Sequence, residues 1–367
     1  MDSGSGFCHD AGKIGTVKTW DVIISGAGII GVALALELRE RGAEVLVLDR
    51  GEPGKEASSA AAGMLCGADL ETPVELWPLT RRSADIYPAF VEKVERLSGM
   101  KVDFRRGTIA LLPSSEVVPP EHRALSSTEL QELEPALNPG SYSAAIAEQE
   151  NSVDPDLLMQ ATLLAARGAG IEVRGHTAVQ EMRSTGAQVE VVGGNERFQA
   201  KVAVNCQGAW AGAPVRPRKG QMLYLQPKNP GLLRHVIRTH EVYLVPRTSG
   251  KILVGATVED VGYDKTVVPE TIQELHRSAA VFIPELASAP VVSSWAGLRP
   301  GTPDDLPILG KTDTPGVFIA TGHFRNGILL APITARIMAD LIGDKSPELD
   351  IAAFSPSRFV AAANPRE

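Results

Sequence analysis

The chain has 367 residues and a formal net charge of -8, with 44% apolar and 22% charged residues. This length exceeds one ordinary domain, and the composition is that of a soluble globular protein with an extensive core. The acidic balance disfavours a nucleic-acid partner, because no basic excess exists to neutralise phosphates. No apolar stretch approaches the roughly 20 residues that span a bilayer, so we expect no membrane insertion.

Residues 1–18 and the cysteines indicate the cellular compartment in which we expect the protein. The first 18 residues are rich in glycine and serine and lack the apolar core of a signal peptide, so we expect a disordered extension. Cys8, Cys66 and Cys206 are too few and too scattered for a disulfide framework or a zinc site. We therefore expect reduced cysteines, no bound metal and a cytoplasmic protein.

The first informative stretch is a strand, a glycine turn, a helix and a second strand. Residues 22–24 form an apolar run typical of a buried strand, and Gly26-Ala27-Gly28-Ile29-Ile30-Gly31 follows with G-x-G-x-x-G spacing. Good helix formers occupy residues 29–41, and residues 44–48 form a second strand. Asp49 ends that strand, where a carboxylate accepts hydrogen bonds from ribose hydroxyls. In this order, the pieces predict a bound dinucleotide.

The other elements follow from apolar periodicity and from glycine and proline punctuation. We expect helices at residues 73–97 (broken near Pro78 and Pro88), 127–133, 155–168 with Asp154 as N-cap, 269–283 and 328–342. We expect strands at residues 104–112, 189–192, 198–204, 222–225, 242–246, 252–257, 291–298 and 316–321, and a rigid turn at residues 299–305. The small residues at 57–65 either form a tightly packed helix or lie against a flat ligand.

Residues 316–342 repeat the strand, glycine turn and helix of residues 22–41. The backbone N–H groups of residues 327–330 would then point at an anionic ligand atom. Between these ends, residues 220–259 alternate short strands with turns, which is typical of an antiparallel sheet. We infer an α/β fold in which a Rossmann-like dinucleotide domain is interrupted by a substrate-binding domain. The predicted ranges are 19–85, 150–216 and 300–367 for the first domain and 86–149 and 217–299 for the second.

Six segments, spread over residues 19–345, carry a resemblance to a known family. They are Gly26 to Gly31, Ser59 to Leu65, Val242 to Arg247, Gly255 to Thr257, Trp295 to Asp304 and Thr321 to Leu329. Together they resemble the flavin-dependent amine oxidases of the D-amino-acid oxidase superfamily, and most closely its glycine oxidase branch. The resemblance implies a flavin fold of the glutathione-reductase type, non-covalent FAD and a substrate domain with a large antiparallel sheet.

The activity that this resemblance implies is oxidative deamination by hydride transfer to flavin N5. Glycine, sarcosine and small D-amino acids would yield a 2-oxo acid, ammonia or an amine, and hydrogen peroxide, with molecular oxygen as acceptor. The resemblance also implies a link to thiazole formation for thiamine, and we expect a homo-oligomer. The alternatives are a D-amino-acid dehydrogenase that passes electrons to a quinone, an NAD-dependent enzyme and a non-catalytic flavin-binding protein.

The resemblance also assigns roles to individual positions. Arg299 matches a carboxylate-binding arginine, Tyr243 a tyrosine that shares the carboxylate, and Arg325 an arginine beside flavin and substrate. The predicted cofactor contacts are Gly26, Gly28, Ile29, Ile30, Gly31, Asp49, Arg50, Ser58, Ser59, Ala62, Gly63, Met64, Val179, Gly208, His323, Phe324, Arg325, Asn326, Gly327, Ile328 and Leu329. Val258 stands where some relatives carry methionine, which leaves the size of the substrate pocket open.

Amino-acid chemistry requires such residues independently of any family. A planar guanidinium holds a carboxylate with two parallel hydrogen bonds, and a phenol adds a third donor. Taken alone, Arg299 is as well explained by a surface ion pair, and Tyr243 by a place in the core. His323 is either a general base or a backbone contact to the flavin; we favour the second, because hydride transfer from a neutral amine needs no base.

Overall fold

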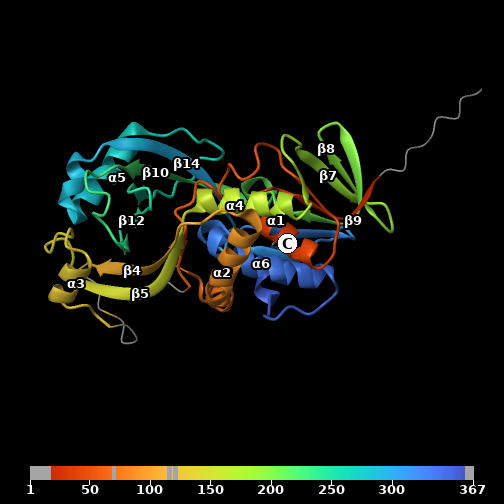
Figure 1. Cartoon of the computed structure of the whole chain (residues 1–367). Helices are drawn as coiled ribbons and strands as arrows, with labels where there is room; N and C mark the ends of the chain where they lie inside the picture. The colour runs from red at the N-terminus through yellow and green to blue at the C-terminus, as the bar shows by residue number, and fades with distance from the viewer. Residues whose placement is uncertain (1–17, 68–71, 114–117, 119–122, 360–367) are drawn as a thin grey trace, which may run out of the picture.

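The computed structural model describes residues 18–67, 72–113, 118 and 123–359, so the expected extension lies outside it apart from residue 18. Two eight-stranded sheets stand at the two ends of an elongated molecule, with α1, α2, α4 and α6 between them (Figure 1). The α-helices are α1 (Ile29–Glu40), α2 (Trp77–Ser98), α3 (Ser127–Leu133), α4 (Pro155–Gly168), α5 (Pro269–Phe282) and α6 (Gly327–Ile342). The shorter 3-10 helices include η1 (Val74–Leu76), η2 (Gly208–Trp210), η3 (Pro284–Ser288), η4 (Phe324–Asn326), η5 (Ala352–Phe354) and η6 (Pro356–Phe359).

The first sheet has the strand order β15-β16-β9-β1-β2-β6, with β7 and β8 as a hairpin beside β9. Its strands are β1 (Thr19–Ser25), β2 (Val45–Leu48), β6 (Glu172–Arg174), β7 (Val179–Ser184), β8 (Val189–Gly193), β9 (Glu196–Asn205), β15 (Ile308–Lys311) and β16 (Val317–Thr321). The pairs from β16 to β6 are parallel, as expected for a dinucleotide domain, while β15, β7 and β8 pair antiparallel.

Both faces of this sheet are covered, which explains the continuous apolar run in β1. Val22 and Ile24 pack into the core formed with α1, α2, α4 and α6. Ile23, between them, packs on the other face against residues of β2, β8 and β9. Successive strand residues point to opposite faces, so a strand buried on both sides is apolar at every position. The predicted strand–turn–helix–strand unit of residues 19–50 is confirmed.

The second sheet has the order β14-β10-β13-β12-β11-β4-β5-β3. Its strands are β3 (Met64–Leu65), β4 (Phe104–Leu112), β5 (Ala144–Val153), β10 (Arg216–Leu225), β11 (Val236–Arg238), β12 (Tyr243–Pro246), β13 (Ile252–Gly255) and β14 (Val291–Gly301). All neighbours pair antiparallel except β4 and β11, which are parallel. Apolar residues of α5, including Ile272, Leu275 and Phe282, share a core with this sheet. The predicted large antiparallel sheet is thereby confirmed.

Arg247 follows β12 directly, and its side chain is buried. Its guanidinium donates to the carbonyl oxygens of Val153 at 3.0 Å and Ala62 at 2.7 Å, and lies 3.7 Å from the Asp154 carboxylate. A buried charge needs such partners, because loss of hydration is otherwise costly. Arg247 thereby fixes the end of β12 against the segment that precedes β3.

Helix α2 differs from its prediction at Pro88. We expected breaks near Pro78 and Pro88, but Pro78 lies in the first turn, where no N–H is needed, and the helix continues through Pro88. An interior proline costs about 3 kcal/mol, whereas each fully buried large apolar side chain contributes roughly 1.5–3 kcal/mol. Ser83 and Tyr87 add hydrogen bonds to carbonyl oxygens of α6. Packing against α6 therefore outweighs the lost helical hydrogen bond.

Residues 299–301 form strand and not the predicted turn. They complete β14, where Arg299 faces Arg218 and Pro300 faces Pro217 of β10. Because β14 is the edge strand of its sheet, the missing N–H of Pro300 is tolerated. This extension carries Arg299 on a regular strand, which holds its backbone more rigidly than a loop does.

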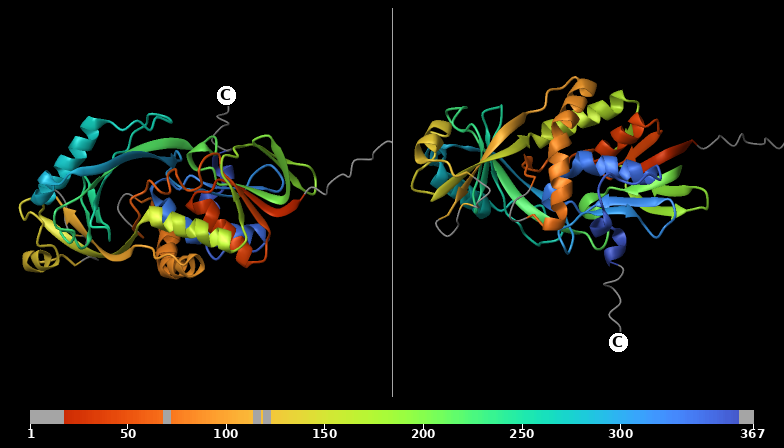
Figure 2. Two further views of the ribbon diagram at one scale, coloured as in Figure 1. Left: turned by 45° about the horizontal axis from the view of Figure 1, so that its top comes forward. Right: turned by 90° about the horizontal axis from the view of Figure 1, so that it is seen from below.

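The two sheets support the predicted division into two domains. Figure 2 shows the antiparallel sheet with α3 and α5 at one end and the parallel sheet at the other, with α2 crossing between them. The apolar face of α2, including Ile86 and Val94, packs into the core of the parallel sheet. The boundaries at residues 85, 149, 216 and 299 stay a prediction.

Two helix N-caps allow a quantitative test of the fold. The Ser126 hydroxyl caps α3 and the Asp154 carboxylate caps α4. Replacing Ser126 by alanine should lower the free energy of unfolding by about 1 kcal/mol. Asp154→Ala should cost more, because it also removes a carboxylate from the buried Arg247. Chemical denaturation of both variants beside the parent protein measures the difference; equal losses would contradict the role given to Arg247.

Candidate active site

A cavity of about 650 Å³ is lined from both sheets. From the parallel sheet come the first glycine turn, the ends of β2 and β9 and the start of α6; from the antiparallel sheet come β10, β12, β13 and β14. Sites of this volume suit cofactors and small ligands. The cavity lies at the carboxyl ends of β1, β2 and β9, where α/β sheets bind their ligands.

One end of the cavity has the donors and acceptors of a dinucleotide site. No side chain caps α1 at Gly28, so its first turn presents backbone N–H groups to the cavity, apart from that of Ile29, which donates to Ser58 Oγ at 2.9 Å. The Asp49 carboxylate accepts from the N–H groups of Ala27 and Gly51 at 2.7 and 2.8 Å. Each carboxylate oxygen has a second lone pair, so Asp49 can still accept from a ribose hydroxyl.

Arg50 lies at the same end but has partners within the protein. Its guanidinium forms an ion pair with Glu56 at 2.9 Å and lies 3.5 Å from the centre of the Trp210 ring. Tyr263 stacks on Trp210 from the segment after β13, with ring centroids 5.7 Å apart, and Lys265 pairs with Glu56. A residue predicted to contact flavin is therefore part of a cluster that joins the two sheets over this end of the cavity.

The start of α6 forms the opposite wall. Phe324, Arg325 and Asn326 form η4, and Phe324 has a φ of 44°, a conformation rare for a bulky residue. No side chain caps α6 at Asn326, so the first backbone N–H groups of this helix have no side-chain acceptor at the N-cap. His323 is buried, and its Nε2 atom lies 3.1 Å from Thr334 Oγ1. The predicted strand, glycine turn and helix are present here, but η4 is inserted before α6, and Asn326 (φ -99°, ψ 7°) differs from the extended Gly28 that precedes α1.

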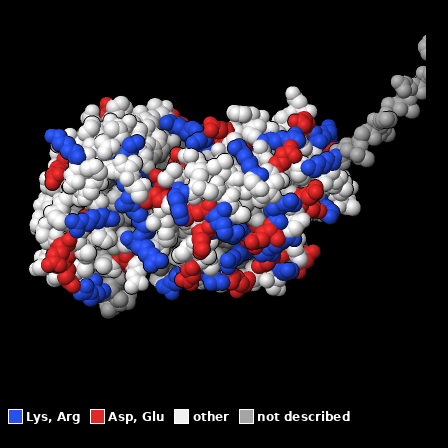
Figure 3. Space-filling view, in the orientation of Figure 1, with Lys and Arg blue, Asp and Glu red and all other residues white. Residues whose placement is uncertain are grey.

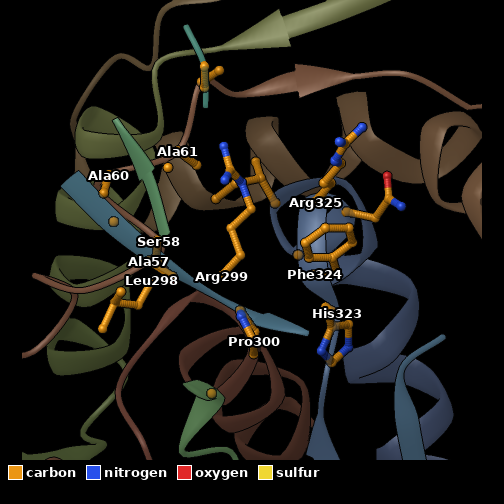
Figure 4. Close-up of a pocket in the computed structure, with 18 of the residues that line it drawn as sticks. Ala57, Ser58, Ala60, Ala61, Leu298, Arg299, Pro300, His323, Phe324 and Arg325 are labelled. Atoms are coloured by element: carbon orange, nitrogen blue, oxygen red, sulfur yellow. The ribbon is translucent and has the colours of Figure 1, made fainter. Parts of the chain in front are cut away.

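Arg299 extends from β14 into the cavity, between the segment of residues 57–61 and the Phe324–Arg325 turn (Figure 4). Its guanidinium lies over Gly220 of β10, where a Cβ atom would stand 2.2 Å from Arg299 Nη1. The Nη1 atom donates to the Thr257 carbonyl oxygen at 3.0 Å. Glycine at position 220 therefore creates the space that this side chain occupies.

Tyr243 reaches the same space from β12 by a similar arrangement. Its ring lies over Gly255, where a Cβ would stand 2.8 Å from the phenol oxygen, and its hydroxyl lies 3.5 Å from Met222 Sδ. Burial raises the pKa of Tyr243, although the Arg299 charge opposes that shift. Burial also lowers the pKa of Arg299, and Tyr243 opposes this change. Arg299 and Tyr243 thus share one poorly hydrated region.

The structure brings most of the predicted site residues together. All three predicted catalytic residues line the cavity, as do the predicted cofactor residues other than Gly31, Ser59 and Leu329. Gly31 packs against the backbone of Gly26, the Ser59 hydroxyl donates to the Glu56 carbonyl oxygen, and Leu329 is buried in the core. Their assignment as contacts stays a prediction, and their positions support an indirect role.

Some lining residues carried no functional signal in the sequence, among them Glu56, Cys66, Gly220, Met222 and Arg238. Gly220 matters only because the Arg299 side chain from another strand lies over it, so no local pattern indicates it. The turns at residues 53–60 exclude the packed helix considered for residues 57–65, and residues 56–58 and 60 line the cavity instead.

The two described cysteines, Cys66 and Cys206, line the cavity. Cys66 Sγ donates to Glu150 at 2.6 Å and accepts from Arg238 at 3.1 Å, and burial raises the pKa of Cys206 to about 12. Cys8 lies outside the described residues. Among the residues that the structure places, no group of histidines, cysteines and carboxylates has the geometry of a metal site.

FAD fits this cavity by the chemistry of its walls. The uncapped N-terminus of α1 suits a pyrophosphate, and Asp49 suits a ribose. Gly208, at a φ of 56°, has no atom within 4 Å of the position of a Cβ, so the wall beside β9 is open. The adenosine half would then lie between α1 and Asp49, and the ring half between η4 and Arg299.

Comparison with known proteins agrees with this fit. Residues 21–341 match the model of the family described as DAO, FAD dependent oxidoreductase. The glycine oxidase of Geobacillus kaustophilus is 33% identical, with 93% of this chain and 97% of that protein covered. The solved structure of a glycine oxidase from the same organism superposes with a TM-score of 0.87 at 32% identity, covering 93% of this chain and 99% of that one.

A second group of relatives is longer. The bifunctional protein ThiO/ThiG of Trichormus variabilis is 35% identical over 94% of this chain but only 56% of its own length. The chain thus spans about half the length of these bifunctional relatives. Because the family model matches most of the chain and the glycine oxidases align over nearly their full lengths, this protein belongs to the DAO family and is an FAD-dependent oxidoreductase.

Proposed function

We propose that this protein oxidises glycine, sarcosine and small D-amino acids with molecular oxygen. The products are the 2-oxo acid, ammonia or the corresponding amine, and hydrogen peroxide. One observation carries the proposal: a guanidinium, placed over a glycine and beside a buried phenol, lies in the same cavity as a dinucleotide cradle. The glycine oxidases among the relatives support the choice of substrate.

Each of the three predicted catalytic residues has a distinct task. Arg299 binds the substrate carboxylate through two parallel N–H donors, and the Tyr243 hydroxyl donates to the same group. Arg325, on the opposite wall, contributes positive charge near the cofactor. The first turn of α1 and Asp49 would hold FAD, which would supply the hydride-accepting and oxygen-reducing chemistry. The protein supplies orientation, because a substrate fixed by its carboxylate presents one C–H bond to the ring.

His323 is suited to a structural task and not to proton transfer. Burial lowers its pKa to about 3, so the imidazole is neutral throughout the working pH range. A general base is most effective when its pKa lies near the working pH. The neutral ring, which contacts Thr334, therefore fixes the turn between β16 and η4.

We also propose a pathway role for the reaction, which the relatives support. The bifunctional ThiO/ThiG proteins support a role in thiazole formation for thiamine. Acidic and basic side chains alternate on the face seen in Figure 3, with no extended basic area there for a polyanion. Within the part of the chain that the structure describes, no helix is both long and apolar enough to cross a bilayer. Cytoplasmic location and homo-oligomer formation stay predictions.

Replacement of Arg299 tests the proposed function. Loss of hydrogen bonds to a charged group costs roughly 1.5–3 kcal/mol, so Arg299→Ala should reduce kcat/KM for glycine by at least about 10- to 100-fold. Arg299→Lys should recover only part, because an ammonium lacks the planar fork. Tyr243→Phe should cost about 1 kcal/mol. Peroxide formation measures each rate.

The control for Arg299 is Arg218→Ala. Arg218 faces Arg299 across the β10–β14 pair but leans toward Gly301 and does not line the cavity. We expect near-normal kcat/KM for this variant. Normal glycine oxidation by Arg299→Ala would exclude the proposed carboxylate contact, and electron transfer to a quinone without peroxide would favour the dehydrogenase alternative.

The low pKa of His323 predicts how stability depends on pH. Its folded pKa lies below the ordinary value of 6.5, so the unfolded chain binds an extra proton as the pH falls below about 6.5. Stability is therefore full above that pH and is lost progressively toward pH 3. His323→Gln, which cannot titrate, should lose less stability than the parent between pH 7 and pH 5. Thermal unfolding across this range measures both slopes; equal slopes would exclude a buried neutral His323.

FAD attachment is a further prediction. We expect non-covalent binding, since residues 321–329 contain no cysteine and the Cys206 thiol is held protonated by burial. Acid precipitation should release all of the yellow colour into the supernatant. Colour that stays with the precipitated protein would show a covalent bond.

A further inference from the structure

The Arg299 guanidinium is hydrogen-bonded to Thr257, a residue that does not line the cavity. Its Nη1 atom donates to the Thr257 carbonyl oxygen at 3.0 Å, so Thr257 sets the direction of the guanidinium. Thr257 lies in the segment of residues 256–268, which joins β13 to α5. This segment has no regular secondary structure of its own, so the position of its carbonyl oxygen depends on what holds the segment in place.

Glu259 holds this segment against β10. Its backbone N–H and carbonyl oxygen each pair with Lys219 at 2.9 Å. Its carboxylate accepts from the Thr257 hydroxyl and from Gln221 Nε2, the latter at 2.8 Å. The Gln221 N–H in turn donates to Thr257 Oγ1 at 2.9 Å. The Thr257 side chain is thus bonded on two sides, which fixes the peptide whose carbonyl oxygen meets Arg299.

Glu259 itself does not touch the cavity. Gly220 is on the face of β10 that Arg299 covers, and residues 219 and 221 point to the opposite face, because neighbouring strand residues alternate. The side chains of Lys219 and Gln221 are 2% and 0% exposed, and with the partly exposed Glu259 they form a polar cluster behind the strand. Neither Glu259 nor Thr257 lines the cavity.

We infer that Glu259 is a positioning residue that acts through Thr257 to aim Arg299 at the substrate carboxylate. The inference rests on the proposed function, in which Arg299 binds that carboxylate. An arginine with free rotamers loses entropy when it binds, whereas an arginine held before binding does not. The Glu259–Thr257 pair therefore strengthens carboxylate binding without contacting the ligand.

Charges around Glu259 agree with this role. The Lys219 ammonium lies 3.5 Å from Glu259 and 3.8 Å from Asp264. Burial tends to raise the pKa of Glu259, but hydrogen bonds from Gln221 and Thr257 and the Lys219 charge together hold that pKa below its ordinary value. Glu259 is therefore ionised, and its charge favours the protonated form of Arg299, which burial disfavours.

The test uses the FAD-loaded enzyme and acetate as the carboxylate probe. Thr257→Val removes the hydroxyl but keeps the shape, and Glu259→Ala removes the carboxylate. Thr257→Ser keeps the hydroxyl, and Asp264→Asn removes the other carboxylate near Lys219 while leaving Thr257 untouched. Acetate titration of the flavin absorbance gives Kd for each variant, and glycine turnover separates KM from kcat. Flavin content and thermal unfolding confirm that each variant is folded.

We expect acetate Kd and glycine KM to rise by about 10-fold in Thr257→Val and Glu259→Ala, the effect of about 1.4 kcal/mol of binding energy. The change in kcat should be smaller. Thr257→Ser and Asp264→Asn should remain within about twofold of the parent, because neither removes a bond that holds the Thr257 peptide. If acetate binding is weakened in Thr257→Val but not in Thr257→Ser, the effect is due to the hydroxyl and not to general destabilisation.

Two results separate the failure of this inference from failure of the proposed function. Parent-like acetate Kd in both Thr257→Val and Glu259→Ala, alongside weak binding by Arg299→Ala, would overturn the positioning role and leave the proposed function intact. An enzyme that fails to oxidise glycine would overturn the proposed function. The acetate titration would still decide the positioning role in that case, because it measures carboxylate binding and not turnover.

Discussion

Close backbone approach at the first glycine turn is the constraint on which the site depends. A Cβ atom at Gly26, whose φ is 111°, would lie 2.2 Å from the Cys206 carbonyl oxygen, and one at Gly31 would lie 2.0 Å from the Gly26 carbonyl oxygen. Any side chain at either position would therefore push α1 away from β1 and β9. With glycine at both, the N-terminus of α1 reaches the cavity, and Asp49 can accept from Ala27 across the turn. The dinucleotide end of the cavity follows from this packing.

At the Arg299 end of the cavity, the loss of hydration on burial is balanced against hydrogen bonds and opposite charge. A guanidinium taken out of water loses hydration, and only hydrogen bonds or an opposite charge restore that loss. For Arg299 the Thr257 carbonyl oxygen and the nearby Glu259 charge provide part of the compensation. A substrate carboxylate would provide the rest, so the same burial that is unfavourable in the free protein favours binding of an anion. At both ends of the cavity, polar groups lie close together because glycines leave room for them. These glycines are Gly26 and Gly31 at one end and Gly220 and Gly255 at the other.

Local sequence signals predicted the elements well and their long-range partners less well. The unit of residues 19–50 and the cap at Asp154 involve neighbours in sequence, so spacing alone indicated them. Pro88 was misjudged because the burial of α2 against α6 is invisible in a local window, and residues 299–301 were misjudged because pairing with β10 decides their conformation. In the site, the family resemblance predicted Arg299, Tyr243 and Arg325, which line the cavity, while the contacts of Arg299 with Gly220 and with the Thr257 carbonyl oxygen could be found only once distant segments were placed side by side.

The central claim is that one cavity holds FAD by the N-terminus of α1 and an amino-acid carboxylate by Arg299. A crystal structure of the yellow enzyme soaked with glycolate, a glycine analogue that carries a hydroxyl in place of the amine, tests it most directly. The pyrophosphate should lie at the first turn of α1, and both carboxylate oxygens of glycolate should lie about 3 Å from the Arg299 nitrogens. A carboxylate bound elsewhere, or a cofactor that does not meet the first turn of α1, would contradict the claim.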